Sequence, residues 1–322
     1  MAAVRDFLDR HFLHFNSREL VASARAYEAH LDAGGEMMIT LAGAMSTARI
    51  GRILSRMIRQ RKVHAISCTG ANLEEDVFNL LAARDYEHVD WRNLSAHDEL
   101  GLLERGMNRV TDTCIPETVM RQVEDKLVAI WRRATEEGRV ELPSTYLCEV
   151  LDDPDLVYHV PAEDSWLLAA KEMGVPVFTP GWEDSTLGNV FTAQVVKGHL
   201  PHHGAVMHGT HQMQVLLQWY REHCGMGSSR PSVGFFQVGG GIAGDFAICA
   251  VPLWIQDLEE PVPLWGYFAQ ISDAVTSYGG YSGAPPNEKI TWGKLGIDTP
   301  KFMVQSDASI CAPLVFAYVL GD

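Results

Sequence analysis

The chain has 322 residues, 47% of them hydrophobic and 21% charged, which is ordinary for a soluble globular protein with a large core. Its net charge of −15 argues against nucleic acid or anionic membrane partners and favours a cationic small molecule or a basic protein. Six scattered cysteines without a CxxC pair indicate free thiols in a reducing compartment. The charged N-terminus argues against a signal peptide, and the longest apolar run, Ile310 to Leu320, is too short to cross a bilayer. We therefore expect a cytoplasmic protein.

Residues 1–36 predict a helical segment that packs on the rest of the chain. Apolar residues repeat at helical spacing from Leu20 to Leu31, with Ser17 before them as a capping residue. Gly34-Gly35 then ends the helix.

Two strand–helix units follow. Residues 37–41 form a short apolar run, a turn of small residues comes next, and residues 50–58 repeat at helical spacing. Residues 63–68 predict a second buried strand, and Asn72 with Glu75 three residues later has the form of a capping box. Such turns can present backbone N–H groups to a phosphate, although any βα turn needs small residues and no GxGxxG is present. Consecutive units of this kind predict a parallel sheet covered on both faces.

Three later apolar runs, 175–178, 232–238 and 302–305, also lead into Gly-, Ser- or Asp-rich turns. The intervening region 91–158 is richer in charge and helix formers, and a helix is predicted over 117–133. There is no linker, low-complexity run or internal repeat. We therefore predict one doubly wound α/β domain over residues 1–322, with a mostly parallel sheet whose strand ends can bind ligands.

Five histidines between residues 199 and 211 raise a metal-site hypothesis, because His208 and His211 could approach each other on a helix. No acidic or cysteine ligand lies at a recognisable spacing, and residues 213–220 have the pattern of an amphipathic helix. We expect a structural role for these histidines and no metal.

The segment 287–294 follows a Gly- and Pro-rich loop over 278–286 and ends at Lys294. A desolvated lysine has a lowered pKa, and its neutral amine can attack an imine or carbonyl carbon. Trp292 could close such a pocket and offer its ring to a substrate ammonium, and Glu288 could hold that ammonium by charge. The alternative is a surface turn with a solvated lysine and a half-buried tryptophan.

The octapeptide Asn-Glu-Lys-Ile-Thr-Trp-Gly-Lys at 287–294 resembles the active-site lysine segment of the deoxyhypusine synthase family. Thr-Gly-Ala-Asn-Leu-Glu-Glu-Asp at 69–76 resembles that family's nucleotide-binding segment. The resemblance runs from about Leu41 to Tyr318, and further matches fall in the family's order: Asn108-Arg109, Pro176-Val177-Phe178-Thr179-Pro180, Leu187-Gly188, Gly239-Gly240-Gly241 and Ser306-Asp307-Ala308-Ser309.

The resemblance implies a Rossmann-like fold, NAD as cofactor, a homotetramer with active sites between subunits, and transfer of the butylamine group of spermidine through a lysine imine. Lys294 would form the imine, and Trp292 and Glu288 would line the amine pocket. The residues that would surround NAD are Ser46, Thr69, Glu75, Asp184, Gly240, Asp307 and Ala308. Hydride transfer needs the protein mainly to position the nicotinamide.

The departures from the family pattern fall in the amine-recognition half of the site. Asn189 stands where the family has an aspartate, Asp245 where it has a histidine, and Tyr278 and Tyr281 replace acidic residues before the lysine. Asn189, Asp245 and Tyr281 are therefore candidate substrate-binding residues, since specificity depends on such contacts. We hypothesise an NAD-dependent aminoalkyl transferase that joins small amines in polyamine biosynthesis, as homospermidine synthases do.

Two alternatives remain open. One is an authentic deoxyhypusine synthase, which would have a translation-factor lysine, and so a protein, as acceptor. The other is a non-catalytic NAD-binding homologue, although the retention of Lys294, Trp292 and Glu288 weighs against it.

Overall fold

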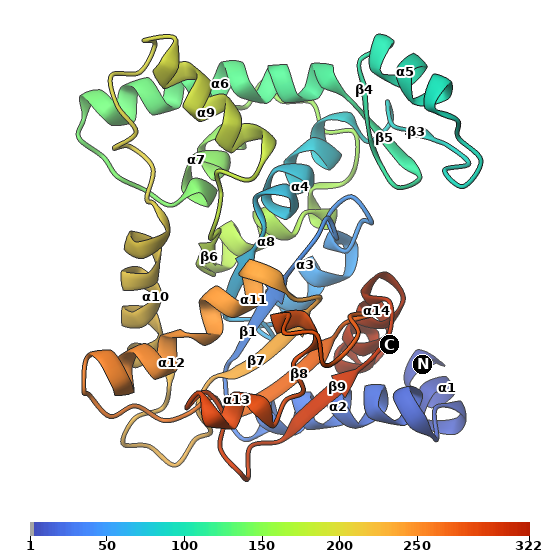
Figure 1. The fold of residues 1–322 in the computed structure, drawn as a ribbon, viewed down its shortest axis with the longest axis vertical. Coiled ribbons are helices and arrows are strands. Elements are labelled where there is room, and N and C mark those ends of the chain that lie inside the picture. Colours follow the sequence, from blue (N-terminus) through green and yellow to red (C-terminus); the bar gives the residue numbers. More distant parts are fainter. Residues whose placement is uncertain (1–2) are drawn as a thin grey trace.

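The computed structural model describes residues 3–322, so the parts of the predicted domain 1–322 and of the segment 1–36 that fall on residues 1–2 lie outside it. A six-stranded sheet forms the centre of the molecule, in the order β6-β2-β1-β7-β8-β9 (Figure 1). Its strands are β1 (Met37–Leu41), β2 (Ala65–Cys68), β6 (Val177–Phe178), β7 (Gly234–Val238), β8 (Tyr267–Ile271) and β9 (Lys301–Val304). Every neighbouring pair is parallel. The predicted doubly wound, Rossmann-like parallel sheet is confirmed, because this is the dinucleotide-binding order, with its reversal between β1 and β7.

Helices cover both faces of the sheet. One face packs against α2 (Phe15–Asp32), α3 (Gly51–Arg59), α8 (Trp166–Met173) and α14 (Ala308–Leu320). The other face packs against α10 (Gly209–His223), α11 (Gly241–Ile248) and α12 (Ala250–Pro252). Because the strands are buried on both sides, they read as continuous apolar runs and not as alternating patterns.

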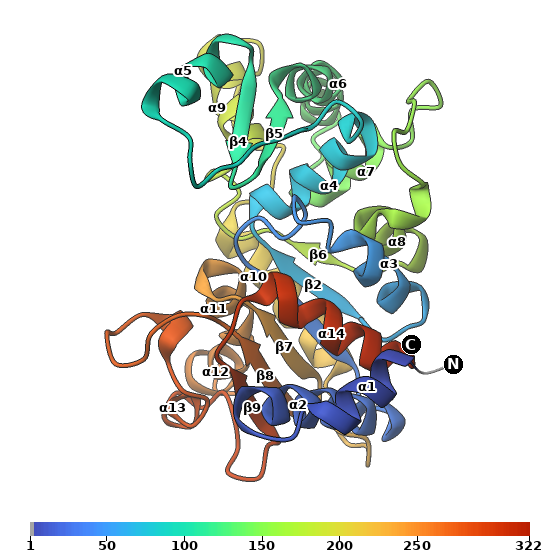
Figure 2. The same cartoon turned by 90° about the vertical axis from the view of Figure 1, so that its right-hand side faces the viewer.

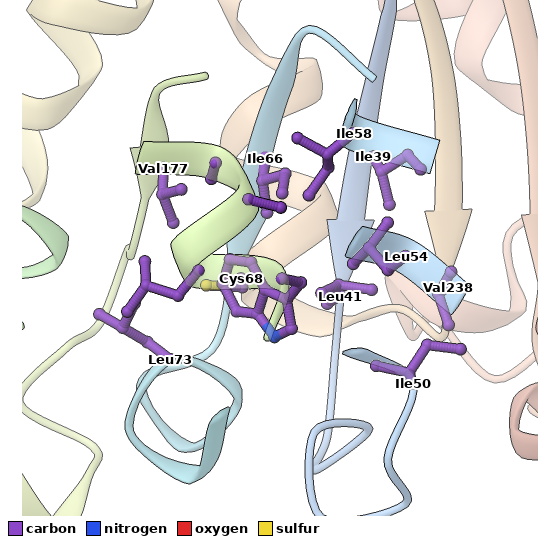
Figure 3. Packing of buried hydrophobic residues seen from close by; sticks show 14 of the residues in the cluster. Ile39, Leu41, Ile50, Leu54, Ile58, Ile66, Cys68, Leu73, Val177 and Val238 are labelled. Carbon is purple, nitrogen blue, oxygen red and sulfur yellow. The ribbon is translucent and has the colours of Figure 1, made fainter. Parts of the chain in front are cut away.

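The core on the α3 side shows how one strand serves both faces. Ile39 and Leu41 of β1 point toward Leu54 and Ile58 of α3 (Figure 3), whereas Met38, the residue before Ile39, packs in the cluster on the α11 side. All five side chains are fully buried. Truncating a leucine such as Leu54 to alanine in a core like this costs about 2–5 kcal/mol.

A second, antiparallel sheet lies at the end of the molecule away from α13 (Glu288–Thr291), as Figures 1 and 2 both show. It has the order β3-β5-β4. Its strands β3 (Glu87–His88), β4 (Met107–Val110) and β5 (Thr113–Pro116) lie near α5 (Ala96–Glu104) and α6 (Glu117–Glu136). The sequence did not predict this sheet, because its strands are short and β3 and β4 are only partly buried. The remaining α-helices of the described residues are α1 (Ala3–His11), α4 (Gly70–Ala82), α7 (Pro143–Val150) and α9 (Thr186–Val196).

Two predicted caps are wrong. Helix α4 begins one turn before Asn72: Thr69 is the N-cap, and its hydroxyl accepts a hydrogen bond from the Asn72 backbone N–H at 3.2 Å. The Asn72 side chain instead donates back to the Gly43 carbonyl at 2.8 Å. Ser17 lies inside the first turn of α2, where its hydroxyl donates to the His14 carbonyl at 2.6 Å.

The described part of the N-terminal segment packs on the domain, with α1 against α14 and α2 against α14 and β9 (Figure 2). The six cysteines all lie within residues 3–322 and are free thiols, as predicted. Over the same residues, no helix combines the length and the apolar character needed to cross a membrane.

Candidate active site

A cavity of about 460 Å³ lies between α11–α12 and the segment that joins β8 to β9. The side chains along its wall that carry chemistry are Asp245, Tyr281, Glu288, Lys289, Trp292 and Lys294. The structure therefore brings together Lys294 and four of the five predicted substrate-binding residues. A cavity of this size is typical of a small-molecule site.

The Lys294 backbone is held by regular contacts on both sides. Gly293 has a φ of +66°, which ends the short helix α13 in a conformation that glycine adopts without strain. The Lys294 N–H donates to the Lys289 carbonyl at 3.1 Å, and the Trp265 N–H donates to the Lys294 carbonyl at 3.3 Å. The lysine is thus anchored against the residues that lead into β8, and is not the tip of a loose surface turn.

The Lys294 side chain is only 8% exposed. Its Nζ lies 3.3 Å from Oδ1 of Asp245 on α11, whose side chain is 50% exposed. The same nitrogen lies 5.5 Å from the ring centroid of Tyr281 and 5.8 Å from that of Trp292. One carboxylate and two aromatic faces therefore surround the amine, which is a suitable environment for small cations.

Tyr281 connects this cavity to the central sheet. Its hydroxyl donates to Oε1 of Gln237 on β7 at 2.7 Å, and burial raises the pKa of the phenol well above its usual value. Tyr281 therefore remains a neutral wall residue at physiological pH. Trp292 is 61% exposed and Glu288 is also exposed, so these two residues lie at the rim, where the cavity opens to solvent.

Lys289 is a site residue that the sequence analysis did not single out. It is 2% exposed, its Nζ donates to the Ala284 carbonyl at 3.1 Å, and it lies 4.9 Å from the Phe268 ring centroid. Burial, and then the charge of Lys294, lower the pKa of Lys289 to about 8. The only signal was its presence in the lysine motif, where a charged side chain normally indicates a solvated face.

The predicted nucleotide half lies along the carboxyl edge of the sheet. Gly43 follows β1 with a φ of +60°, and no atom lies within 4 Å of the place where its Cβ would be. Gly239 and Gly241 follow β7 with φ values of +81° and +61°. Asp307 caps α14 by accepting from the Ser309 N–H at 2.7 Å, and Ala308 begins that helix. Glycine turns at the β1–β7 reversal, with open space beside Gly43 and Gly241, fit the backbone approach that a dinucleotide needs.

Ser46 and Thr69 hold the loop after β1 in place. Ser46 is fully buried; its hydroxyl donates to the Asn72 carbonyl at 2.7 Å and accepts from Trp166 Nε1 at 2.9 Å. The Thr69 hydroxyl donates to the Gly43 carbonyl at 2.7 Å. Both hydroxyls therefore have hydrogen-bonding partners within the protein, and these contacts fix the loop after β1 beside α4.

Gly240 lies where the β7 turn meets the segment that leads to Lys294. A Cβ at this position would lie 1.9 Å from Oγ of Ser282, and that hydroxyl accepts from the Gly241 N–H at 3.0 Å. Only glycine fits there. The contact joins the predicted cofactor edge to the loop that carries Tyr281.

Glu75 lies on α4 between two other buried acids, Glu74 and Asp76. It accepts a hydrogen bond from the Thr47 hydroxyl. Burial, reinforced by the charge of Glu74, raises the pKa of Glu75 to about 7.

Asp184 and Asn189 are exposed, on the loop before α9 and on α9 itself. The Asn189 amide donates to the Ser185 carbonyl at 2.6 Å. Among residues 3–322, the wall of the Lys294 cavity does not include either residue. Asn189 is thus the one predicted substrate-binding residue that this chain places elsewhere.

A second cavity of about 540 Å³ lies beside α9 and α10. Its wall includes Trp182, Phe191, His203, His208 and His211. The His208 and His211 rings are tilted, with centroids 6.2 Å apart. Over residues 3–322, no group of three or more His, Cys, Asp or Glu side chains is placed to hold a metal ion.

The strand order and the glycine turns after β1 and β7 place the protein in the dinucleotide-binding α/β class. The family model of deoxyhypusine synthase matches residues 10–319, so the chain belongs to the deoxyhypusine synthase family. This family is NAD-dependent and its members are transferases.

Curated relatives cover most of the chain. The chain is 29% identical to "Probable deoxyhypusine synthase 2" of Methanosarcina mazei, over 94% of this chain and 81% of that protein. It is 26% identical to "Probable deoxyhypusine synthase 1" of Archaeoglobus fulgidus, over 95% of this chain and 90% of that protein. It is 27% identical to the "Deoxyhypusine synthase-like protein" of Chlorobaculum parvum, over 94% of this chain and 82% of that protein. A crystal structure of a "putative deoxyhypusine synthase" from Entamoeba histolytica shares the fold, with a TM-score of 0.56 at 12% identity over 93% of this chain and 86% of that one.

Proposed function

We propose that this protein is an NAD-dependent aminoalkyl transferase that carries the transferred group as an imine on Lys294 and passes it to a small amine, an activity like that of a homospermidine or spermidine synthase. The observation that carries the proposal is the position of Lys294 in a cavity of about 460 Å³: its side chain is 8% exposed, and its Nζ lies 3.3 Å from Oδ1 of Asp245. A chain of a few methylenes with an ammonium group fits a cavity of this size and charge.

NAD, when bound, would supply the hydride chemistry at the carbon beside the donor nitrogen: acceptance of a hydride from the donor and its return to the product imine. Lys294, once deprotonated, forms a C–N bond to the imine carbon of the oxidised donor, and the donor's remaining amine leaves with a proton. The acceptor amine then attacks the Lys294 imine, and the Lys294–carbon bond breaks to release the free lysine. In this mechanism Asp245 holds the substrate ammonium beside Lys294, and the rings of Tyr281 and Trp292, 5.5 and 5.8 Å from Lys294 Nζ, contribute their aromatic faces to the same cation.

The second candidate is transfer to a lysine of a protein. Two observations favour it: curated relatives are named deoxyhypusine synthases, and the cavity rim at Trp292 and Glu288 is exposed. We also propose a cytoplasmic homotetramer, as the family resemblance implies. Light scattering of the purified protein tests the oligomeric state.

The test is one incubation of the protein with NAD and a panel of amines: spermidine, putrescine, agmatine and diaminopropane. A parallel tube contains a lysine-bearing translation factor, and both are read by mass spectrometry. We expect new polyamines without labelling of the protein acceptor. Labelling of the acceptor would instead favour an authentic deoxyhypusine synthase. No product in either tube, with NAD still bound, would favour a non-catalytic homologue.

A further inference from the structure

Lys289 is a buried amine in the wall of the Lys294 cavity that the proposed mechanism does not use. It is 2% exposed, and its Nζ donates one hydrogen bond, to the Ala284 carbonyl at 3.1 Å. An ammonium group has three N–H donors, so two of them would have no hydrogen-bonding partner among residues 3–322. Over the same residues no carboxylate forms an ion pair with Lys289. Burial under these conditions disfavours the charged form of the amine.

The two lysines of the cavity therefore differ in how well their surroundings accept a cation. Oδ1 of Asp245 lies 3.3 Å from Nζ of Lys294 and compensates an ammonium there. Nζ of Lys289 instead lies 4.9 Å from the ring centroid of Phe268 and 5.0 Å from that of Tyr281. An aromatic face compensates a positive charge only weakly in comparison with a carboxylate. The position of Lys289 thus favours a neutral amine more than the position of Lys294 does.

The charged groups nearest to Lys289 act in both directions. Glu288, its neighbour on α13, and Asp245 on α11 favour its charged form, and Lys294 opposes it. Burial is the largest influence and the charge of Lys294 is the second, so that the pKa of Lys289 is lowered to about 8. A general base is most effective when its pKa lies near the working pH.

The other titratable groups of the cavity wall are poorer proton acceptors. Burial raises the pKa values of Cys249 and Tyr281, so both keep their protons near pH 7. Lys294 carries the transferred group during the acceptor step. The remaining groups are carboxylates, which are weak bases in comparison with an amine: Asp245, Asp257 and Glu288. Among the described residues that line the cavity, Lys289 is therefore the best suited to take a proton from a substrate amine.

The acceptor step needs such a group, because a small aliphatic amine arrives as an ammonium and has no lone pair with which to attack carbon. We propose that Lys289, a buried amine without a carboxylate partner in the wall of this cavity, is the general base that deprotonates the acceptor ammonium. The inference rests on the proposed function, since it concerns the second half of that transfer.

The protons balance as follows from this assignment. An N–H bond of the acceptor ammonium breaks, and its proton forms an N–H bond with Nζ of Lys289. The freed amine forms a C–N bond to the carbon of the protonated Lys294 imine. A second proton then passes from the attacking nitrogen to the Lys294 nitrogen, whose bond to carbon breaks. Lys294 leaves as a neutral amine, and Lys289 releases its proton to solvent after the product has left.

The experiment is a competition between two acceptors in one tube, run as a single turnover with NAD and spermidine as donor. Putrescine arrives as an ammonium and needs a base, whereas methoxyamine is a weak base that is already neutral at pH 7. Both attack the same Lys294 imine, so the ratio of their products, measured by mass spectrometry, reports only the acceptor step. A merely structural role of the hydrogen bond to Ala284 would affect both acceptors alike.

We expect the ratio of putrescine product to methoxyamine product at pH 7 to fall about a hundredfold in Lys289→Met. Lys289→Gln is a second neutral replacement and should show the same loss. Lys289→Arg keeps a cation but cannot accept a proton, so it should lose as much as the neutral variants. Lys197→Met removes an exposed lysine after α9 and should leave the ratio unchanged.

The pH dependence of the same ratio is a second readout. In the parent protein the ratio should rise as pH increases through about 8, where Lys289 loses its proton. In Lys289→Met this rise should move to the higher pH at which putrescine itself loses a proton.

Each outcome separates this inference from the proposed function. An unchanged ratio in Lys289→Met and Lys289→Gln, with the fold intact by circular dichroism, overturns the base assignment and leaves the transferase assignment in place. A parent-like ratio in Lys289→Arg also overturns it, because a cation would then be sufficient. If the parent protein forms neither product while NAD is bound, the proposed function fails and the acceptor step fails with it.

Discussion

Two regions of the molecule bury ionisable side chains, and they compensate the charge in different ways. Helix α4 buries three consecutive acids, Glu74, Glu75 and Asp76, and the cavity beside α11 buries Lys289 and Lys294. Glu74 and Asp76 are tied to neighbouring helices by several hydrogen bonds, whereas among residues 3–322 Glu75 and each of the two lysines have one hydrogen-bonding partner. Burial of charge alone therefore does not identify chemistry; the number and type of partners separates a structural group from one that is free to react.

The outer acids of α4 act as capping groups for other helices. Glu74 accepts from the Thr186 and Leu187 N–H groups at 3.0 and 2.8 Å, at the first turn of α9. Asp76 accepts from the Leu167 N–H at 3.1 Å and from the Ser165 hydroxyl at 2.5 Å, at the first turn of α8. Negative charge at a helix N-terminus is favourable, which offsets the cost of burial.

The largest effect is expected at Lys294. We expect Lys294→Arg to reduce transfer at least a thousandfold, because arginine keeps the cation beside Asp245 but cannot form the imine. NAD affinity should stay within about twofold of the parent value, as measured by titration. A matched loss of NAD binding would place this lysine in the cofactor site, and retained transfer would exclude it as the nucleophile.

Asp76→Asn is expected to have the next largest effect, on stability. The amide NH2 group would face at least one of the hydroxyl or N–H donors that Asp76 now accepts, which leaves buried donors unsatisfied. We expect a loss of about 2–3 kcal/mol in urea denaturation. Asp98→Asn is the control, since Asp98 makes a similar cap with Ser95 at an exposed position, and its loss should be clearly smaller.

Most of the parallel sheet could be predicted from the sequence. Apolar runs followed by Gly-, Ser- or Asp-rich turns located five of the six parallel strands, because strand period and turn chemistry are local properties. Strand β8 was missed although Ser272-Asp273 follows it in the same way, and the antiparallel sheet was missed because its strands are short.

The lysine motif was found by resemblance, but the sequence did not show that its other lysine, Lys289, is buried in the cavity wall. Lys289 is buried by Phe268 of β8 and by Tyr281 of the loop before α13, and such burial depends on how the β8–β9 connection packs back on the sheet. The capping error at Asn72 has a similar origin, since the Asn72 side chain is engaged by the loop after β1. Local sequence patterns predict helices, strands and their approximate ends. The hydrogen bonds of a buried polar side chain depend on residues from other parts of the fold, which these patterns do not contain.

Asp245 tests whether the lysine cavity recognises cations. We expect Asp245→Asn to raise the KM for a donor amine by about tenfold and to leave NAD affinity unchanged, because it removes the negative charge closest to Lys294. Asp257→Asn removes the same charge from another part of the cavity wall and should change KM much less. Equal effects of the two variants on KM would indicate that the cavity attracts the donor amine through its overall negative potential, and not through a specific contact with Asp245.

Glu75 is buried beside the capping acids of α4 but, like the two lysines, has one hydrogen-bonding partner among residues 3–322. The pH dependence of folding stability shows whether its burial is costly, as expected for a functional group, or stabilising, as expected for a structural one. Its folded pKa, about 7, lies above its usual value of about 4.5, chiefly because of burial and then because of Glu74. Between these two pH values the folded chain keeps a proton that the unfolded chain has released. The contribution of Glu75 to folding stability is therefore fully present below about pH 4.5 and is lost as pH rises from about 4.5 through about 7.

Glu75→Gln removes this ionisation while its side-chain oxygen can still accept from Thr47. We expect the variant to be more stable than the parent by about 2 kcal/mol at pH 8, with the difference fading toward pH 5, in urea denaturation at a series of pH values. If Glu75 also binds a ribose hydroxyl of NAD, the same variant should bind NAD a few-fold more weakly, since a neutral amide is a weaker acceptor than a carboxylate. A gain in stability with a loss in NAD affinity is the pattern of a residue kept for function. A loss of stability at every pH, like that expected for Asp76→Asn, would instead group Glu75 with the structural acids of α4.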